Sequence, residues 1–276
     1  MDEKVTLTAH RGYRQKFPEN TMIAFKEALK LDIDAIEMDV HMTRDHEIVV
    51  MHDAAMDRTT DMTGKICDKT YDEVRTADAG IKFGEQFKGE KVPSLREFLE
   101  LMATRPDVKV LLELKDYPEE LGEFAYASCE KTLALCKEYG VWGEERLTVI
   151  TFSTEICAWI RQRHGGEKIV IHGFWPKYIM HGWEKDNPYK YIDEVCLFNN
   201  ERTVDGRALP KDSPVARKEK FDEFSAMGIK SCVYFRFDNN EEDYAAALKN
   251  GALGFTCDDA FTCGKILDKL GARKLK

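Results

Sequence analysis

The chain has 276 residues, a hydrophobic content of 43% and a formal net charge of −9. This length allows one large domain or two small ones, with enough apolar residues for a sizeable core. The negative charge argues against general nucleic-acid binding, and any site for an anionic substrate must supply its own positive charge.

The cysteines and the N-terminus bear on location. None of the eight cysteines forms a Cys-x-x-Cys pair, so a thiolate zinc site has little support, and we expect buried reduced thiols. No apolar run approaches the ~20 residues of a membrane span. The N-terminus lacks a basic and apolar leader, although a mature chain that has lost its signal peptide would look the same. We therefore expect a cytoplasmic protein without stable membrane insertion.

The first part of the chain shows three short strand patterns with polar residues at or near their C-terminal ends. A Pro-Glu-Asn-Thr turn that opens a helix follows the first strand. The expected strands and their polar residues are 5–9 with His10, 34–40 with Glu37 and Asp39, and 48–51 with His52. Because side chains alternate along a strand, Glu37 and Asp39 share one face.

Residues 53–91 differ from their surroundings. They are polar and rich in turns, and they show no long amphipathic period. Scattered apolar residues indicate a small insertion rather than a linker. We predict a single domain over 1–276 that contains this insertion.

Strands and helices then alternate to the end of the chain. The expected elements are helix 94–102, strand 108–114, helix 119–139, strand 147–152, helix 154–163, strand 168–172, an apolar piece at 195–198, helix 221–227, strand 231–237, helix 241–249, strand 253–257 and helix 262–270. Such alternation predicts an α/β fold with a parallel sheet, and about eight units fit a TIM-type (β/α)8 barrel. Nine strands are one too many, so either 48–51 or 195–198 is surplus, or one unit has lost its helix.

The active site of such a barrel lies at the C-terminal ends of its strands. Glu37, Asp39 and Glu113 would meet there as hard oxygen ligands, which suit Mg²⁺ or Ca²⁺. An inward acidic pair without a cation would be costly to bury. We therefore predict one divalent metal ion at this rim.

Four further residues reach the same rim. His10 and His52 would flank a reacting phosphorus, one as base and the other as acid. Arg11 and Lys115 would contact the phosphate oxygens, since a guanidinium can bind them through two hydrogen bonds. His172, Trp175 and Phe235 are candidate pocket-lining residues, although the aromatic rings could simply pack in the core.

Several short motifs in this sequence can be compared with a known family. They are His10-Arg11-Gly12, Pro18-Glu19-Asn20-Thr21, Glu37-x-Asp39, His52-Asp53, Val92-Pro93-Ser94-Leu95, Glu113-x-Lys115 and Thr151-Phe152-Ser153. Over roughly residues 8–155 they closely resemble the glycerophosphodiester phosphodiesterase family.

The resemblance implies a TIM-type barrel with a small inserted subdomain after the third strand, and it implies the same metal ligands, histidine pair and phosphate contacts. It implies metal-dependent hydrolysis of glycerophosphodiesters to sn-glycerol 3-phosphate and an alcohol, either through a cyclic phosphate or by direct attack of water. The alternatives are a lysophospholipase D, a phosphoinositide-type phosphodiesterase and a non-catalytic phosphodiester-binding barrel. The second half departs from the family at Phe235-Arg236-Phe237-Asp238 and at 254–260, which leaves the alcohol group open.

Overall fold

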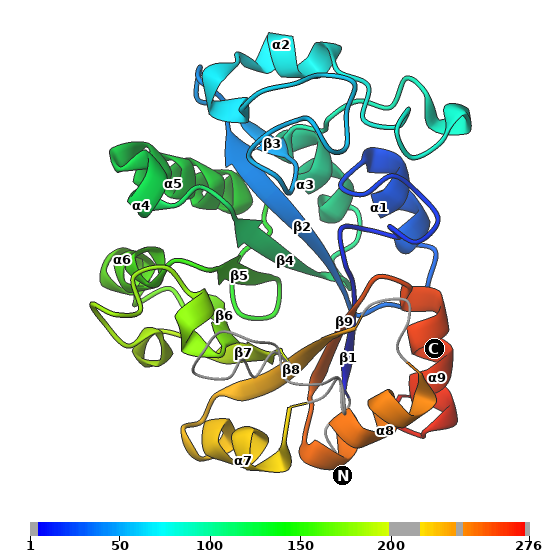
Figure 1. The fold of residues 1–276 in the computed structure, drawn as a ribbon, viewed down its shortest axis with the longest axis vertical. Coiled ribbons are helices and arrows are strands. Elements are labelled where there is room, and N and C mark those ends of the chain that lie inside the picture. The colour runs from blue at the N-terminus through cyan, green and yellow to red at the C-terminus, as the bar shows by residue number, and fades with distance from the viewer. Residues whose placement is uncertain (1–4, 199–215, 236–239, 274–276) are drawn as a thin grey trace, which may run out of the picture.

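A computed structural model describes residues 5–198, 216–235 and 240–273. Within them, eight parallel strands form a closed barrel, because β1 pairs with both β2 and β9. Helices surround the strands on the outside (Figure 1). The barrel strands are β1 (Thr6–Ala9), β2 (Ala35–Met42), β4 (Lys109–Leu114), β5 (Leu147–Thr151), β6 (Val170–Trp175), β7 (Glu194–Leu197), β8 (Lys230–Phe235) and β9 (Gly254–Cys257). This closed parallel arrangement confirms the predicted (β/α)8 fold.

The ninth strand resolves the strand count that the sequence left open. β3 (Ile48–Val50) runs antiparallel to the end of β2, from Val40↔Val50 to Met42↔Ile48, and takes no part in closing the barrel. β7 pairs in parallel with β6 and β8, so the apolar piece near 195–198 is a true barrel strand. The hairpin of β2 and β3 therefore extends one barrel strand beyond the rim.

The helices follow the predicted order with one correction. In chain order they are α1 (Met22–Ala28), α2 (Tyr71–Thr76), α3 (Leu95–Ala103), α4 (Pro118–Leu121), α5 (Glu123–Glu138), α6 (Thr154–His164), α7 (Lys218–Ala226), α8 (Glu241–Asn250) and α9 (Ala260–Lys269). A single helix over 119–139 was expected, but Gly122 adopts a φ of +56° and divides it into α4 and α5. A left-handed residue cannot continue a right-handed helix, and glycine adopts this conformation at little cost.

The outer faces of the strands pack against the helices. α3 begins at Ser94, whose side chain forms a capping box with Glu97, and it buries Leu95, Phe98, Leu99 and Met102. Each such side chain contributes roughly 1.5–3 kcal/mol relative to an exposed one. The ring of Phe98 meets Phe25 of α1 edge-on with centroids 4.7 Å apart, which packs these two helices against each other.

Residues 53–91 form their own small apolar cluster beside β3, and in Figure 1 they lie at one edge of the molecule, outside the ring of barrel helices. They contain α2 and two short 3₁₀ helices, Ile66–Asp68 and Glu85–Phe87. Met56, Ile66 and Val74 are fully buried there against Val49. The division into one domain over 1–276 with an insertion at 53–91 stays a prediction.

Two further 3₁₀ helices, Lys177–Ile179 and Pro188–Lys190, lie between β6 and β7. Residues 199–215 lie outside the described residues, as do Arg236, Phe237 and Asp238 of the segment that departs from the family. Among the described residues, no helix combines the length and the apolar character that a membrane crossing requires.

Candidate active site

The acidic residues meet at the rim as the strand pattern predicts. Glu37 and Asp39 lie on one face of β2, and the parallel register pairs Asp39 with Glu113 of β4. All three side chains are buried, and one carboxylate oxygen from each lies within 4.8 Å of the others. Oε1 of Glu37 and Oδ1 of Asp39 are buried without a hydrogen-bond partner. Because buried carboxylate oxygens almost always have partners, this arrangement fits a divalent cation bound by oxygen ligands.

The crowding of these carboxyl groups shows in their pKa values. Burial, together with the charges of Asp39 and Glu113, raises the pKa of Glu37 well above its ordinary value. Burial would also raise the pKa of Asp39, but the charges of Lys115 and Arg11 outweigh it and lower that pKa. A bound cation would ionise all three groups, since it replaces mutual repulsion with a shared attraction.

The loop after β1 is strained where it meets this cluster. Arg11 and Asn20 both adopt a φ of +55°, a left-handed conformation that is uncommon outside glycine. In this conformation the backbone N–H of Arg11 donates to Oε2 of Glu37 (2.9 Å), and the side-chain amide of Asn20 donates to Oδ2 of Asp39 (2.8 Å). Gly12 follows with a φ of +78°, and a Cβ there would lie 2.8 Å from the backbone of Ala24.

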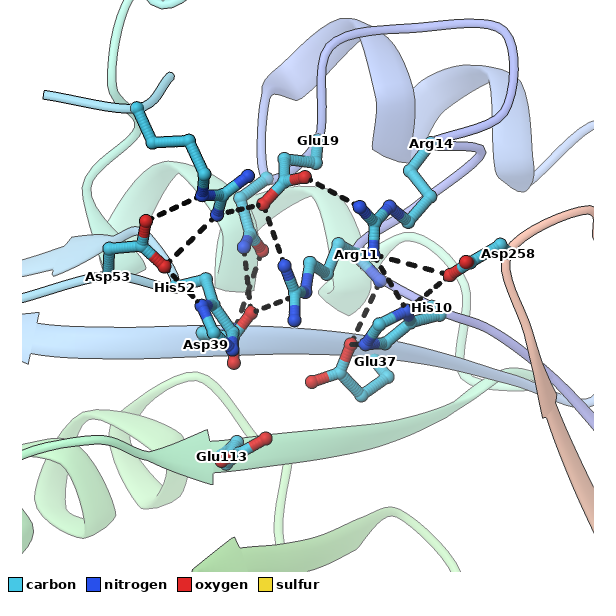
Figure 2. Close-up of polar contacts among 12 residues, drawn as sticks. His10, Arg11, Arg14, Glu19, Glu37, Asp39, His52, Asp53, Glu113 and Asp258 are labelled. Atoms are coloured by element: carbon cyan, nitrogen blue, oxygen red, sulfur yellow. Dashed lines mark hydrogen bonds and ion pairs between the residues drawn. The ribbon is translucent and has the colours of Figure 1, made fainter. Parts of the chain in front are cut away.

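The two histidines lie at opposite ends of the acidic cluster (Figure 2). Nδ1 of His10 is 2.6 Å from Oδ1 of Asp258, and Nδ1 of His52 is 2.5 Å from Oδ1 of Asp53. A carboxylate at Nδ1 selects the tautomer with its proton on that nitrogen and fixes the ring. In both rings Nε2 is then the atom available for proton transfer.

The surroundings of these rings keep them neutral. Burial lowers the pKa of His10 to about 4, although the hydrogen bond that the ring donates to Asp258 acts in the opposite direction. Burial also lowers the pKa of His52. Each imidazole can therefore accept a proton at neutral pH, and one that has gained a proton is ready to donate it.

The predicted phosphate-binding cations both reach the cluster. Lys115 places Nζ 2.7 Å from Oε1 of Glu113, 3.1 Å from Nε2 of His52 and 3.7 Å from Oδ1 of Asp39. Nε of Arg11 is 3.3 Å from Oδ2 of Asp39. These two cations are nine-tenths buried and lie between the histidines, which suits them to hold an anionic group there.

Further charged residues surround the acidic cluster and hold its side chains in place. Glu19 accepts hydrogen bonds from Arg11, Arg14 and Arg58 at 2.8 to 2.9 Å. Arg58, which comes from the 53–91 segment, also bonds both oxygens of Asp53. Residues of that segment thus help to hold the His52 end of the site.

Three residues that hold the histidines were given no role in the sequence analysis: Asp53, Asp258 and Tyr234. Asp53 directly follows His52, so their adjacency was the available signal. Asp258 directly follows β9, and its position at a strand end could have suggested it. Tyr234 of β8 donates to Asp258 at 3.1 Å, and its ring meets His10 edge-on at 4.7 Å.

The structure places the three candidate pocket-lining residues elsewhere. Phe235 is 1% exposed and packs against Tyr244 of α8 and Phe255, on the outer face of the barrel. Trp175 packs on the core with Lys220 of α7 5.8 Å above its ring. His172 is the third residue of β6, not its last, and faces a cavity at the opposite end of the barrel.

A different set of rings lines the rim between Lys115 and His10. We name Phe152, Phe174, Phe198 and Tyr234 the aromatic arc. Phe152 and Phe174 stack with centroids 3.6 Å apart, and Phe174 and Phe198 stack at 5.5 Å. Phe198 meets Tyr234 edge-on at 6.3 Å, and Nζ of Lys115 lies 5.8 Å from the Phe152 ring.

The closed parallel barrel, whose rim carries buried carboxylates flanked by two histidines, defines the chain as a (β/α)8 protein with a candidate metal and proton-transfer site. The profile of the glycerophosphoryl diester phosphodiesterase family matches residues 10–260, and the chain belongs to this family.

Its relatives agree with this assignment. A glycerophosphodiester phosphodiesterase of Caldanaerobacter subterraneus is 42% identical over 151 residues, which cover 54% of this chain and 59% of the relative. One from Bacillus altitudinis is 44% identical over 39% of this chain and 44% of its own length. The chain thus spans about half the length of the curated relatives it matches.

Solved structures extend the likeness to the whole fold. A phosphodiesterase of Oleispira antarctica, in complex with the product sn-glycerol-3-phosphate, superimposes with a TM-score of 0.77. It shares 21% sequence identity over 96% of this chain and 97% of that chain. At this identity the likeness establishes the barrel fold.

Proposed function

We propose that this chain is a metal-dependent glycerophosphodiester phosphodiesterase that yields sn-glycerol 3-phosphate and an alcohol. One observation carries the proposal: two histidines with carboxylates at Nδ1 flank three buried acidic residues, and two of these, Glu37 and Asp39, each have one buried oxygen without a hydrogen-bond partner. Membership of the family supports it, as does the product bound in the Oleispira antarctica structure.

Glu37, Asp39 and Glu113 would hold the metal ion, for which we propose Mg²⁺ or Ca²⁺ because the donors are all carboxylate oxygens. A bound divalent ion supplies Lewis-acid stabilisation of charge on the phosphate. Arg11 and Lys115 would bind and orient the phosphate oxygens. Their burial strengthens that attraction, since little water screens it.

The histidines would move the protons. Nε2 of one imidazole accepts the proton of the attacking hydroxyl. The other ring must first bind a proton at Nε2, which the negative charge of a bound phosphodiester favours, and it then donates that proton to the leaving alcohol. The same pair serves internal attack by the glycerol 2-hydroxyl, through a cyclic phosphate, and direct attack by water. Asp258 and Asp53 act as positioning residues, because each fixes the ring that carries the proton.

Hydrolysis of a lysophospholipid is a second candidate function. The aromatic arc supports it, because Phe152, Phe198 and Tyr234 keep part of their surface exposed beside the proposed phosphate position. Such rings offer apolar contact area to an alcohol group or an acyl chain. The two candidate functions differ only in the alcohol group of the substrate, and the proposed chemistry is the same for both.

A substrate screen tests the function. Metal-stripped protein would be assayed with Mg²⁺ or Ca²⁺ on glycerophosphocholine, glycerophosphoethanolamine, glycerophosphoinositol and lysophosphatidylcholine. We expect release of sn-glycerol 3-phosphate from at least one of the first three, loss of turnover in EDTA and its return with metal. Turnover that survives thorough chelation would refute the metal requirement, and no turnover on any diester would favour a binding role.

The composition of the chain supports proposals about its partners and its cellular location. We propose a small-molecule substrate, no nucleic-acid partner and a cytoplasmic location without stable membrane insertion. A net charge of −9 supports the absence of a nucleic-acid partner, family membership supports the small-molecule substrate, and eight free cysteines support a reducing compartment.

A further inference from the structure

The N-terminal end of the barrel contains a polar cavity. It encloses about 730 Å³ of space not filled by atoms, with the open solvent at its mouth included. The interior of a (β/α)8 barrel is usually filled by layers of bulky branched side chains. Here much of the lining is polar or charged: Thr6, Thr8, Asp34, Lys109, Thr148, His172, Glu194, Lys230, Cys232 and Thr256.

Three of these side chains converge from neighbouring strands. His172 of β6 pairs in register with Glu194 of β7, and β8 contributes Cys232 beside them. Nδ1 of His172 lies 3.3 Å from Oε2 of Glu194, and one ligand atom from each of the three residues lies within 4.8 Å of the others. The side chains of His172 and Glu194 are only 5% and 16% exposed. Together they offer one nitrogen, one oxygen and one sulfur to a common point.

Two further observations point to a ligand. Thr148 lines the same cavity, and its buried Oγ1 has no hydrogen-bond partner among the described residues. Buried hydroxyl groups are almost always satisfied, so a water or ligand in the cavity is expected to pair with it. Gly254, in register with Cys232, keeps the space free, because a Cβ there would lie 2.8 Å from the Cys232 sulfur.

We propose that His172, Glu194 and Cys232 form a second metal site, for a borderline-soft divalent cation such as Zn²⁺. Ligand atoms around tetrahedral zinc lie roughly 3.3–3.6 Å apart for the usual Zn–N and Zn–S bond lengths. The 3.3 Å separation of His172 and Glu194 already matches, and the Cys232 sulfur, within 4.8 Å of both ligand atoms, lies within the reach of a side-chain adjustment. The fourth position faces the cavity and is free for water or an anion.

The charges are compatible with this assignment. A dication would be neutralised by the carboxylate of Glu194 and the thiolate of Cys232. Lys109 and Lys230, which also line the cavity, would then remain to hold an anionic fourth ligand. The site differs in kind from the carboxylate rim, because nitrogen and sulfur donors select transition metals over Mg²⁺ or Ca²⁺. Bound metal would join β6, β7 and β8.

Cobalt(II) provides a specific test, since a thiolate bound to it gives a charge-transfer absorption that carboxylates alone do not. The protein would carry Cys67→Ser, which removes the partly exposed thiol of the 53–91 segment, and would be metal-stripped and saturated with Mg²⁺ at the rim. We expect one equivalent of Co²⁺ to produce the sulfur band and Zn²⁺ to displace it.

Matched variants locate the site. Cys232→Ser should abolish the sulfur band, and His172→Gln should weaken Zn²⁺ binding by about tenfold or more, while Cys157→Ser, a buried thiol on α6, should change neither. Circular dichroism would verify the fold of each variant. No sulfur band in the parent protein, or an unchanged band in Cys232→Ser, would overturn the proposal. Binding of inorganic phosphate to metal-stripped protein without any Co²⁺ uptake would also overturn it and identify an anion site. Diesterase activity is not read in any arm, so the outcome is independent of the proposed function.

Discussion

The rim of the barrel consists of two unlike halves. The ends of β9, β1, β2 and β4 and the loops that follow them carry the charged half, where each carboxylate is held by an arginine, a lysine, a histidine or an asparagine. The ends of β5 to β8 carry the aromatic arc, in which each aromatic ring packs against the next. Charged groups fixed by short hydrogen bonds suit a reaction that is the same for every substrate, and rings suit contacts that vary with the alcohol.

The two halves meet at His10. Its ring packs against Tyr234 of the arc, while its Nδ1 is held by Asp258. If the division is real, substitutions in the charged half should reduce kcat for every substrate. Substitutions in the arc should change which substrate is preferred.

The largest effect is expected from the histidine pair. His10→Ala or His52→Ala should lower kcat by about 10²–10⁴, because each removes one proton-transfer group from the transition state. Steady-state kinetics on the substrate identified by the screen would measure it, with thermal unfolding to verify the fold. His46→Asn, in an exposed turn at a φ of +66° that asparagine tolerates, is the control and should keep full activity. Full activity in either alanine variant would remove the proposed histidine mechanism.

Asp258→Asn should have the next largest effect. An amide cannot hold the His10 ring and its proton as a carboxylate does, so kcat should fall by about 10–100-fold with little change in KM. Asp53→Asn should cost less, because the Asp53 side chain is 31% exposed against 6% for Asp258. A rise in KM as large as the fall in kcat for Asp258→Asn would indicate that the substitution disrupts the pocket and that Asp258 does not act by positioning a ring.

Much of the charged half was predictable because local rules determine it. Period-two alternation placed Glu37 and Asp39 on one face, and the parallel register of neighbouring strands brought Glu113 to them. Asp258 was assigned no role because its partner His10 lies 248 positions away in the chain. No short sequence pattern can show that two residues so far apart in the chain form a contact.

The aromatic arc and the cavity at the N-terminal end of the barrel were not predicted, for a related reason. Which face of β6 and β8 points inward depends on the register around the closed barrel, and a slip of one residue exchanges inward for outward side chains. Trp175 and Phe235 were therefore taken for lining residues, whereas their neighbours Phe174 and Tyr234 belong to the arc. Likewise, only the antiparallel pairing of β3 could reveal which strand was surplus.

The charged half should also make stability depend on pH. Burial would raise the pKa of Glu19, but the hydrogen bond from Arg58 and the charges of three arginines outweigh it and lower the pKa to about 2. A carboxyl group with a depressed pKa in the folded state stabilises the protein above its ordinary value of 4.5, and this contribution is lost as the pH falls toward 2. Glu19→Gln should therefore cost about 1–2 kcal/mol at pH 7 and progressively less below pH 5.

Urea unfolding of the Glu19→Gln and parent proteins at a series of pH values would measure this difference. Glu138→Gln is the matched control, since Glu138 forms an exposed pair with Arg96 and should change stability by less than about 0.5 kcal/mol at any pH. A Glu19→Gln difference that stays constant from pH 7 to pH 3 would show that the arginine cluster does not depress this pKa.

The smallest effect is expected in the aromatic arc, and it separates the two halves most directly. Phe198→Leu keeps an apolar side chain but removes a stacked ring, which is worth about 0.5–1.5 kcal/mol, or roughly a 2–10-fold change in KM. That change should differ between glycerophosphocholine, glycerophosphoinositol and lysophosphatidylcholine, while kcat stays within a few fold. Phe235→Leu removes a ring from the outer face of the same barrel, so it should lower stability and leave the order of substrates unchanged. If Phe198→Leu leaves the order of substrates unchanged, or Phe235→Leu changes it as much, the arc has no part in choosing the alcohol.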